Sequence, residues 1–321
     1  MYTYGPVPSR RLGRSLGVSP IPPKTCSYSC VYCQLGRTNH LRIKRESFYP
    51  KEEIFSEIQK NARTSKPDYV TFVGDGEPTL CKDLGWLIDK TRNELGLPTA
   101  VITNGSLLSL EDVRRDLAKT DVLLPSLDAG SEKTFRQINR PHRSIKYYDL
   151  LQGLKDFRME FTGQMWLEVM LVQGLNDSKE ELSNIKSAAD LIKPDRIYVV
   201  TPIRPPAESW VKPPSPETIL KAQQILGNTI PLTELESGDF GLREFTDARQ
   251  AIVEIGSRHP LRLDQARKIE NAFSSGEVVG RMIKEKELIK VEYNNRYYVL
   301  PAHFIRRRGT DHSGKKETEN E

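Results

Sequence analysis

Short runs of β-branched and other apolar residues alternate with amphipathic stretches along residues 16–202. Such alternation predicts parallel β/α units, in which each strand is followed by a helix that packs on the sheet. The runs that predict strands are residues 16–21, 69–73, 100–103, 122–127, 165–172 and 196–202. The stretches that predict helices are residues 51–63, 84–95, 110–118, 145–158 and 179–191. Six units favour a curved, incomplete barrel, with functional residues at the C-terminal ends of its strands.

The chain changes character after the sixth predicted strand, where proline recurs through residues 202–216. Proline fixes one backbone angle and lacks an N–H donor, so this segment cannot be regular helix or central strand. We therefore place a barrel domain at residues 1–212. A linker with one helix, expected at 216–226, follows over residues 213–240.

Residues 241–305 predict a second, smaller domain. Helices are expected at 247–256, 263–273 and 277–287, and a β-hairpin at 289–293 and 296–300 around an Asn-Asn turn. Three short helices followed by a hairpin are typical of a winged helix, a variant of the helix-turn-helix unit. The polar residues 306–321 predict a disordered tail. The predicted fold class is α/β, a partial (β/α)6 TIM-like barrel with a small C-terminal winged-helix-like domain.

Three of the four cysteines, Cys26, Cys30 and Cys33, lie in the eight-residue segment CSYSCVYC. The N-terminus lacks the charged-then-apolar pattern of a signal peptide, and in a long cytosolic chain such a cluster indicates metal rather than disulfides. Three thiolates at this spacing can bind three irons of one [4Fe–4S] cube and leave the fourth iron without a protein ligand. Zinc is the alternative, but it prefers four ligands, usually as two pairs. Cys81 stands alone and is expected to be a buried, small apolar residue.

This Cys-x3-Cys-x2-Cys spacing, with the aromatic Tyr32 just before the last cysteine, resembles the signature of the radical S-adenosylmethionine (SAM) superfamily. The resemblance implies a six-unit partial TIM barrel, with SAM bound to the open iron through its amino and carboxylate groups. It also implies an electron donor such as ferredoxin or flavodoxin. The electron cleaves the SAM sulfonium and releases a 5′-deoxyadenosyl radical for hydrogen abstraction from a substrate. Tyr32 is expected near the adenine of SAM.

Polar segments after the second and third predicted strands are expected to contact SAM. Gly76-Glu77, within the sequence GDGEP, resembles the family's GGE segment, which contacts the SAM amino group, and Asp75 departs from that pattern. Asn104 ends the third strand, where it could hold SAM or substrate or simply form a turn. Before the first strand, the basic residues at 8–14 could bind phosphate or a substrate carboxylate.

The last three strands carry further expected ligands of SAM. Ser126 and Asp128 share one face that suits the ribose hydroxyls, with a cap for the next helix as the alternative. Glu168 lies within a strand, where a carboxylate is costly unless paired. It is expected to face the barrel interior and meet SAM, substrate or an arginine, with a structural ion pair as the alternative. Val199 is expected near adenine, and Arg204 could bind an anionic group or lie at the surface.

The opening segment, residues 5–18, resembles a little-characterised prokaryotic branch that is grouped with the wyosine-type tRNA-modifying synthases. The substrate does not follow from that grouping, because the longer synthase has elements that this sequence lacks. The winged-helix-like domain instead favours a tRNA or another nucleic acid as partner, bound through Arg281, Lys284, Lys286 and Arg296. A protein-binding or purely structural role of that domain is the alternative. The net charge of +5 permits a nucleic-acid partner without demanding one.

A non-enzymatic alternative is an iron–sulfur redox sensor that binds nucleic acid without catalytic turnover. The expected SAM-binding residues argue against it, because a sensor needs no SAM pocket. No apolar run approaches the roughly 20 residues needed to cross a bilayer. The sequence thus predicts a cytoplasmic radical SAM enzyme without a membrane partner.

Overall fold

The computed structural model describes residues 1–227, 229–232, 240–242 and 245–302. Its largest sheet has eight strands in the order β1-β2-β5-β6-β7-β8-β9-β10. In that order they span Thr3–Ser9, Gly13–Val18, Tyr69–Phe72, Thr99–Thr103, Val122–Pro125, Gln164–Met170, Arg196–Val200 and Thr229–Leu232. β1 runs antiparallel to β2, and every other neighbouring pair in this sheet is parallel. The predicted parallel β/α order is confirmed.

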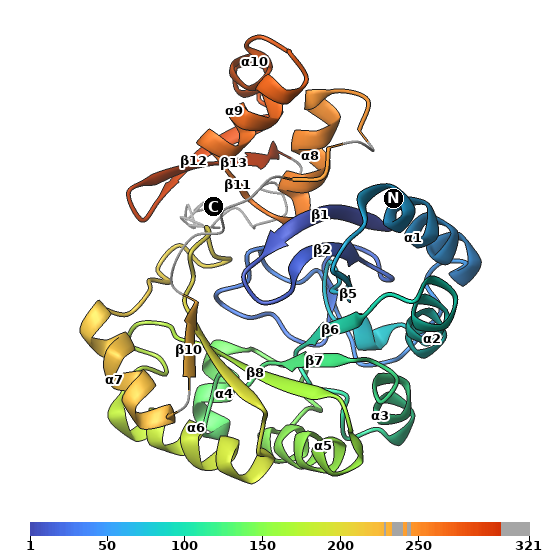
Figure 1. The fold of residues 1–321 in the computed structure, drawn as a ribbon. Helices are drawn as coiled ribbons and strands as arrows, with labels where there is room; N and C mark the ends of the chain where they lie inside the picture. Colours follow the sequence, from blue (N-terminus) through green and yellow to red (C-terminus); the bar gives the residue numbers. More distant parts are fainter. Residues whose placement is uncertain (228, 233–239, 243–244, 303–321) are drawn as a thin grey trace, which may run out of the picture.

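Helices cover the outer face of this sheet (Figure 1). They are α1 (Lys51–Ser65), α2 (Leu84–Leu95), α3 (Glu111–Leu117), α4 (Glu132–Ile138), α5 (Tyr147–Glu160), α6 (Lys179–Ile192) and α7 (Pro216–Leu226). Successive side chains of a strand point to opposite faces. Accordingly, Leu16, Val101 and Leu167 pack with the helices, whereas Trp166 and Tyr198 pack edge to face on the opposite, inner face. A shift of one residue therefore moves a side chain from the helices to the inner face.

Two strands that the sequence did not predict lie at the two edges of the sheet. β1 contains Pro6 and Pro8, and β10 contains Pro231. Proline is tolerated at an edge, where a missing N–H costs no ladder hydrogen bond, so these strands do not read as strands in the sequence. Because α7 and β10 continue the β/α order, that part of the predicted linker at 213–240 belongs to the barrel. The first predicted strand, at 16–21, begins and ends earlier, as β2.

Shorter elements lie between these strands and helices. β3 (Thr25–Cys26) and β4 (His40–Leu41) form a separate parallel pair, and a 3-10 helix, η1, spans Pro78–Leu80. Among the described helices, none combines the length and the apolar character that a bilayer span requires.

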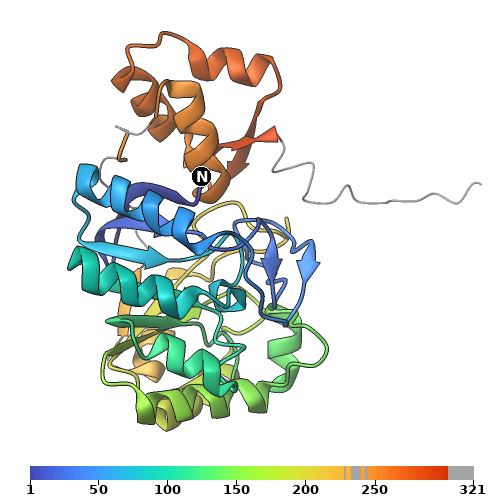
Figure 2. The same ribbon diagram turned by 90° about the vertical axis from the view of Figure 1, so that its right-hand side faces the viewer.

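A second unit follows over residues 245–302. It contains α8 (Ala248–Arg258), β11 (Leu261–Arg262), α9 (Leu263–Ala272), α10 (Val278–Lys284), β12 (Leu288–Tyr293) and β13 (Arg296–Pro301). The predicted hairpin is confirmed, with Asn294 and Asn295 both at positive φ, and β11 adds a third antiparallel strand. The unit has its own apolar cluster and stands at one end of the barrel, over β1 and α1 (Figures 1 and 2). The predicted tail at 306–321 and parts of the predicted linker lie outside the described residues.

A buried and an exposed leucine give a test of this packing. Leu167 is completely buried against the helices, whereas Leu191 of α6 is 55% exposed. We expect Leu167→Ala to lower the free energy of unfolding by about 2–5 kcal/mol, because it opens a cavity in a packed core. Leu191→Ala removes the same atoms from the surface and should change it by less than about 0.5 kcal/mol. Anaerobic urea unfolding followed by circular dichroism measures both, and equal losses would contradict the packing.

Candidate cluster and cofactor site

The cysteine loop, residues 26–33, begins at the end of β3 and is anchored to α4. The Val31 N–H donates to the Ile138 carbonyl at the end of that helix, at 2.9 Å. Tyr28 is almost completely buried and packs edge to face on Phe135, with the ring centroids 5.4 Å apart. The three thiols of the loop remain half-buried. The loop therefore presents three partly accessible sulfurs from a fixed backbone.

The environment of these sulfurs disfavours ionised thiols in the absence of a cation. Burial raises the pKa of Cys26 and of Cys30 well above the usual range of a thiol, and nearby negative groups, Cys33 among them, raise it further. Metal binding to deprotonated thiolates offsets that cost. Two amides also donate to sulfur, Asn104 Nδ2 to Cys26 Sγ at 3.6 Å and Asn139 Nδ2 to Cys30 Sγ at 3.5 Å. Hydrogen bonds of this kind tune iron–sulfur centres.

The number and type of ligands in the cysteine loop fit a cluster. Its three thiolates can each bind a different iron of a [4Fe–4S] cube, whereas structural zinc takes four ligands. Cys81 lies elsewhere, 1% exposed in the helix-facing core, as predicted.

Glu77 joins the ends of two strands. Its carboxylate is buried, and Oε1 accepts hydrogen bonds from the hydroxyls of Thr79 and Thr103, both at 2.6 Å. Oε2 accepts from the Asn104 N–H at 2.7 Å. Burial raises the pKa of Glu77, and these donors lower it. The side chain expected to meet the SAM amino group is therefore fixed by protein donors, and it also fixes the backbone of Asn104 beside the cysteine loop.

Gly76 lies directly against the start of the cysteine loop. A Cβ at this position would lie 1.7 Å from the Thr25 carbonyl oxygen, so no other residue fits without moving the backbone. The neighbouring Glu77 N–H donates to the same carbonyl at 3.0 Å. The glycine of the Gly-Glu pair is thus required for close packing of the segment after β5 on β3.

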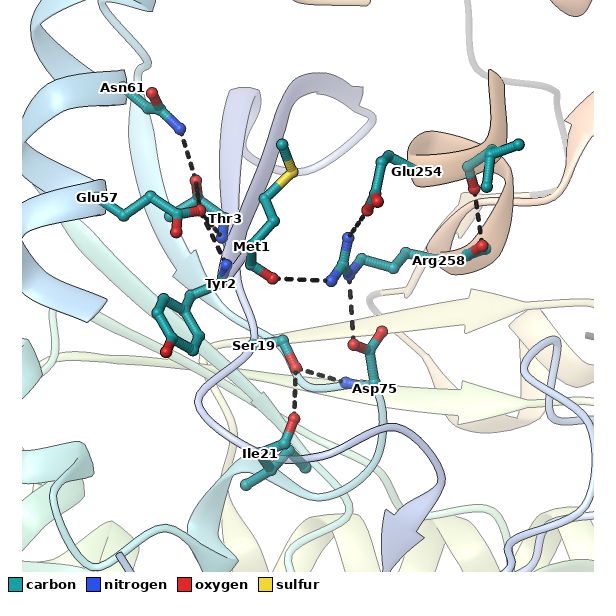
Figure 3. A network of polar contacts seen from close by, with 12 residues as sticks. Met1, Tyr2, Thr3, Ser19, Ile21, Glu57, Asn61, Asp75, Glu254 and Arg258 are labelled. Atoms are coloured by element: carbon teal, nitrogen blue, oxygen red, sulfur yellow. Dashed lines mark hydrogen bonds and ion pairs between the residues drawn. The ribbon is translucent and has the colours of Figure 1, made fainter. Parts of the chain in front are cut away.

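Asp75, the residue that departs from the family pattern, contacts the C-terminal unit (Figure 3). Arg258, at the end of α8, lies 3.3 Å from Asp75 Oδ2 through its Nε, and its other nitrogens bond the Met1 carbonyl and Glu254, each at 3.1 Å. Its guanidinium also stands 5.4 Å from the centroid of the Tyr4 ring. One arginine therefore ties the second unit to the N-terminus and to the segment that carries Glu77.

Asp128 and Tyr32, which were both expected to contact SAM, lie next to each other. The Tyr32 hydroxyl donates to Asp128 Oδ2 at 2.5 Å, Asn139 Nδ2 donates to the same oxygen at 2.7 Å, and the Met170 N–H donates to Oδ1 at 2.9 Å. Burial raises the pKa of Asp128, and these donors lower it. The carboxylate thus holds the residue that precedes the last cysteine.

Neither Ser126 nor Asp128 caps the next helix. The N-cap of α4 is Ser131, whose hydroxyl accepts from the Thr134 N–H. The capping alternative is therefore wrong. Ser126 is half-buried and forms a β-bridge with Glu168, so the two expected ligands are neighbours across β7 and β8.

Glu168 lies on the inner face and forms an ion pair with Arg11, and both side chains are mostly buried. Glu168 has the expected inward orientation, and its pairing with Arg11 is what the alternative of a structural ion pair also requires. Arg11 comes from the turn between β1 and β2, and the adjacent Leu12 packs on the inner face with Trp166. The basic segment of residues 8–14 thus contributes the side chains of Arg11 and Leu12 to the barrel interior.

Val199 does not lie on the face where it was expected. It is completely buried in the cluster that faces the helices, whereas Tyr198 and Val200 belong to the inner face. Because strand side chains alternate with a period of two residues, the expected contact of Val199 with adenine is wrong by one position.

Arg204 joins the cysteine loop to the second unit. Its Nη1 donates to Gln34 Oε1 at 2.8 Å, one residue after the last cysteine, and its Nη2 lies 2.9 Å from His259 Nε2. It is therefore not a solvated surface arginine. Neither Asn139 nor Arg258 could be found from the sequence, because neither belongs to a motif and both reach the site from distant elements.

Comparisons with known proteins agree with this geometry. The family model of the radical SAM superfamily matches residues 21–184. A UPF0026 protein of Methanocaldococcus jannaschii is 37% identical over 305 residues, which cover 92% of this chain and 95% of that protein. A GTPase Obg of Brachyspira hyodysenteriae is 44% identical over 222 residues, which cover 69% of this chain and 33% of that protein. A solved radical SAM methyltransferase from Sphaerobacter thermophilus has a similar fold, with a TM-score of 0.52 and 18% identity over 70% of this chain and 67% of that chain.

The Arg258–Asp75 pair yields a prediction with a defined pH dependence. Arg258→Met leaves a buried carboxylate without its cation, which costs about 3–5 kcal/mol. Burial raises the pKa of Asp75 and Arg258 lowers it, so the variant raises it further. A group with a higher pKa in the folded state binds more protons there, so stability falls as pH rises through that pKa. The loss in the free energy of unfolding should be largest at neutral pH and shrink on acidification.

Urea unfolding at several pH values measures this loss. Asp75→Asn in the Arg258→Met background should recover part of it. Arg267→Met, at an exposed position of α9, should cost less than about 0.5 kcal/mol. A loss for Arg258→Met that does not vary with pH would contradict the pairing.

Proposed function

Because the chain belongs to the radical SAM superfamily, we propose that it cleaves SAM reductively and directs the resulting radical to a nucleic-acid substrate. Its cofactors are a [4Fe–4S] cluster and SAM. When bound, the cluster supplies one electron to SAM, which then releases a 5′-deoxyadenosyl radical that abstracts hydrogen. The proposal rests on the number of cysteines in the cysteine loop. Three of the four cysteines lie there, and Cys81 is buried elsewhere. One iron is thus left for SAM.

The residues around the cysteine loop have distinct roles in this proposal. Cys26, Cys30 and Cys33 would hold the cluster. Asn104 and Asn139 would hold two of the sulfurs in place, since they already donate to them. These amides would also favour the reduced cluster, because a donor near sulfur stabilises added negative charge.

Further residues would bind SAM. Gly76 and Glu77 would offer backbone and carboxylate to its amino group, and Tyr32 and Asp128 would contact adenine and ribose. Ser126 lies beside Glu168 on the inner face and is suited to the same ligand. Arg204 would bind an anionic group, which its position beside Gln34 supports.

The second unit supports nucleic acid as the substrate class. Its order of helix, strand, two helices and hairpin matches a winged helix, a common nucleic-acid-binding unit. The resemblance of residues 5–18 also supports a grouping with wyosine-type tRNA-modifying synthases.

We propose domain limits of 1–232 for the barrel and 245–302 for the second unit. An electron donor such as ferredoxin or flavodoxin would supply the electron.

The enzymatic reading is tested by 5′-deoxyadenosine formation. Protein reconstituted without oxygen is mixed with SAM and dithionite, and the product is measured by mass spectrometry. We expect product from the wild-type protein and none above background from Cys30→Ala, because that variant lacks one of the three thiolates that hold the cube. Cys81→Ala is the matched control and should retain most of the activity. An iron–sulfur sensor without turnover would instead bind iron and yield no 5′-deoxyadenosine.

The substrate is tested separately. Nucleoside mass spectrometry of tRNA from a deletion strain and its parent should reveal a modified nucleoside that is present only in the parent. An unchanged tRNA profile would remove tRNA modification and leave SAM cleavage intact as a proposal.

A further inference from the structure

A hollow of about 790 Å³ opens on the second unit between α9 and the turn of the β12–β13 hairpin. We call it the basic hollow. Its lining includes the side chains Arg262, Arg267, Lys268, Asn271, Arg296 and Tyr297. It lies apart from the cysteine loop and involves none of the residues expected to bind SAM.

Positive charge predominates in the basic hollow. Its lining holds four cationic side chains and one carboxylate, Asp264, which is hydrogen bonded to Arg262 at 3.0 Å. Arg267, Lys268 and Arg296 are exposed, and Lys268 also attracts the Asp264 carboxylate. Four cations against one carboxylate leave a net positive charge, which attracts a polyanion and repels a cationic partner.

The neighbouring helix α10, which the sequence favoured as the nucleic-acid contact, carries Arg281 and Lys284 and has carboxylates of adjacent segments beside it. Arg249 of α8 forms ion pairs with Glu285 and Glu287, which follow α10. The smaller hollow at that site is lined by Arg249 and Arg281 together with Asp247 and Glu285. Equal numbers of cations and carboxylates give little attraction for phosphate. The favourable surface is therefore formed by α9 and the hairpin.

The chemistry of the basic hollow suits a nucleic acid better than an acidic protein. Tyr297 is 47% exposed, and the Lys290 ammonium lies 3.7 Å from its ring centroid. This cation–π contact orients an exposed ring beside the cations. Cations bind phosphates, aromatic rings stack on bases, and amides such as Asn271 and Asn295 donate to phosphate or sugar. An acidic peptide would use the cations and leave the ring without a role.

We propose that the basic hollow binds the phosphate backbone of an RNA substrate, an inference that rests on the proposed nucleic-acid substrate. The unit is fixed to the barrel, since the hydroxyls of Tyr293 and Tyr298 donate to the carbonyls of Pro202 and Ile203 at 2.8 and 2.6 Å. Those carbonyls immediately precede Arg204. RNA bound in the hollow is thereby held at a set position relative to the barrel.

The test compares two triple variants with the same change of charge. The first is Arg267→Gln with Lys268→Gln and Arg296→Gln, in the basic hollow. The second is Arg281→Gln with Lys284→Gln and Lys286→Gln, in and after α10. Dissociation constants for fluorescently labelled, in vitro transcribed tRNA are measured by anisotropy over a range of salt concentrations, with the reconstituted full chain. Formation of 5′-deoxyadenosine without RNA is measured in parallel.

We expect the hollow variant to weaken tRNA binding at least about tenfold. The slope of log K against log salt concentration should fall by an amount that corresponds to about two to three phosphate contacts. The α10 variant should weaken it less than about threefold, and both should form 5′-deoxyadenosine as the wild type does. Equal losses in the two variants, or no tRNA binding by the wild type, would overturn the proposal. Displacement of tRNA by polyglutamate of equal charge at equal concentration would overturn it in favour of an acidic protein partner.

If the wild type binds tRNA through the hollow but forms no 5′-deoxyadenosine, the proposed reaction fails and the binding surface stands. If it forms 5′-deoxyadenosine but does not bind tRNA, the surface fails and SAM cleavage stands.

Discussion

The packing of Gly76 on the Thr25 carbonyl is the contact on which the candidate site depends, because it joins the cysteine loop to the ends of the parallel strands. Through the neighbouring Glu77, that contact extends to Thr103 and to the backbone of Asn104, whose amide reaches Cys26. Three chain segments distant in sequence are thus held in one arrangement around half-buried sulfurs. Small changes in this packing would alter the spacing of the sulfurs.

The second unit belongs to this arrangement. Arg258 bonds Asp75, Arg204 bonds both Gln34 and His259, and the phenols of the hairpin bond the segment after β9. Two of these contacts, at Asp75 and at Gln34, lie in segments next to the cysteine loop. The C-terminal unit therefore supports the loops of the site and can present a bound partner to the barrel at the same time.

Much of the fold could be read from the sequence, because buried parallel strands are nearly continuous runs of β-branched residues. β1 and β10 were not predicted, because edge strands tolerate the prolines that argue against a strand elsewhere. The cysteines were readable because their ligand spacing is local. The Arg258–Asp75 pair was not, because its partners stand 183 residues apart and only the tertiary fold brings them together. Val199 was misplaced although β9 begins where the sequence predicted, because a strand that is apolar on both faces has no alternation that tells one face from the other.

The central claim is that three thiolates hold a cube with one iron free to bind SAM. Mössbauer spectroscopy of protein reconstituted with 57Fe, with and without SAM, tests it most directly. We expect a [4Fe–4S] spectrum in which one iron becomes distinct when SAM is added, as a higher coordination number requires. A spectrum that SAM leaves unchanged, or a protein that takes up zinc in place of iron, would contradict it.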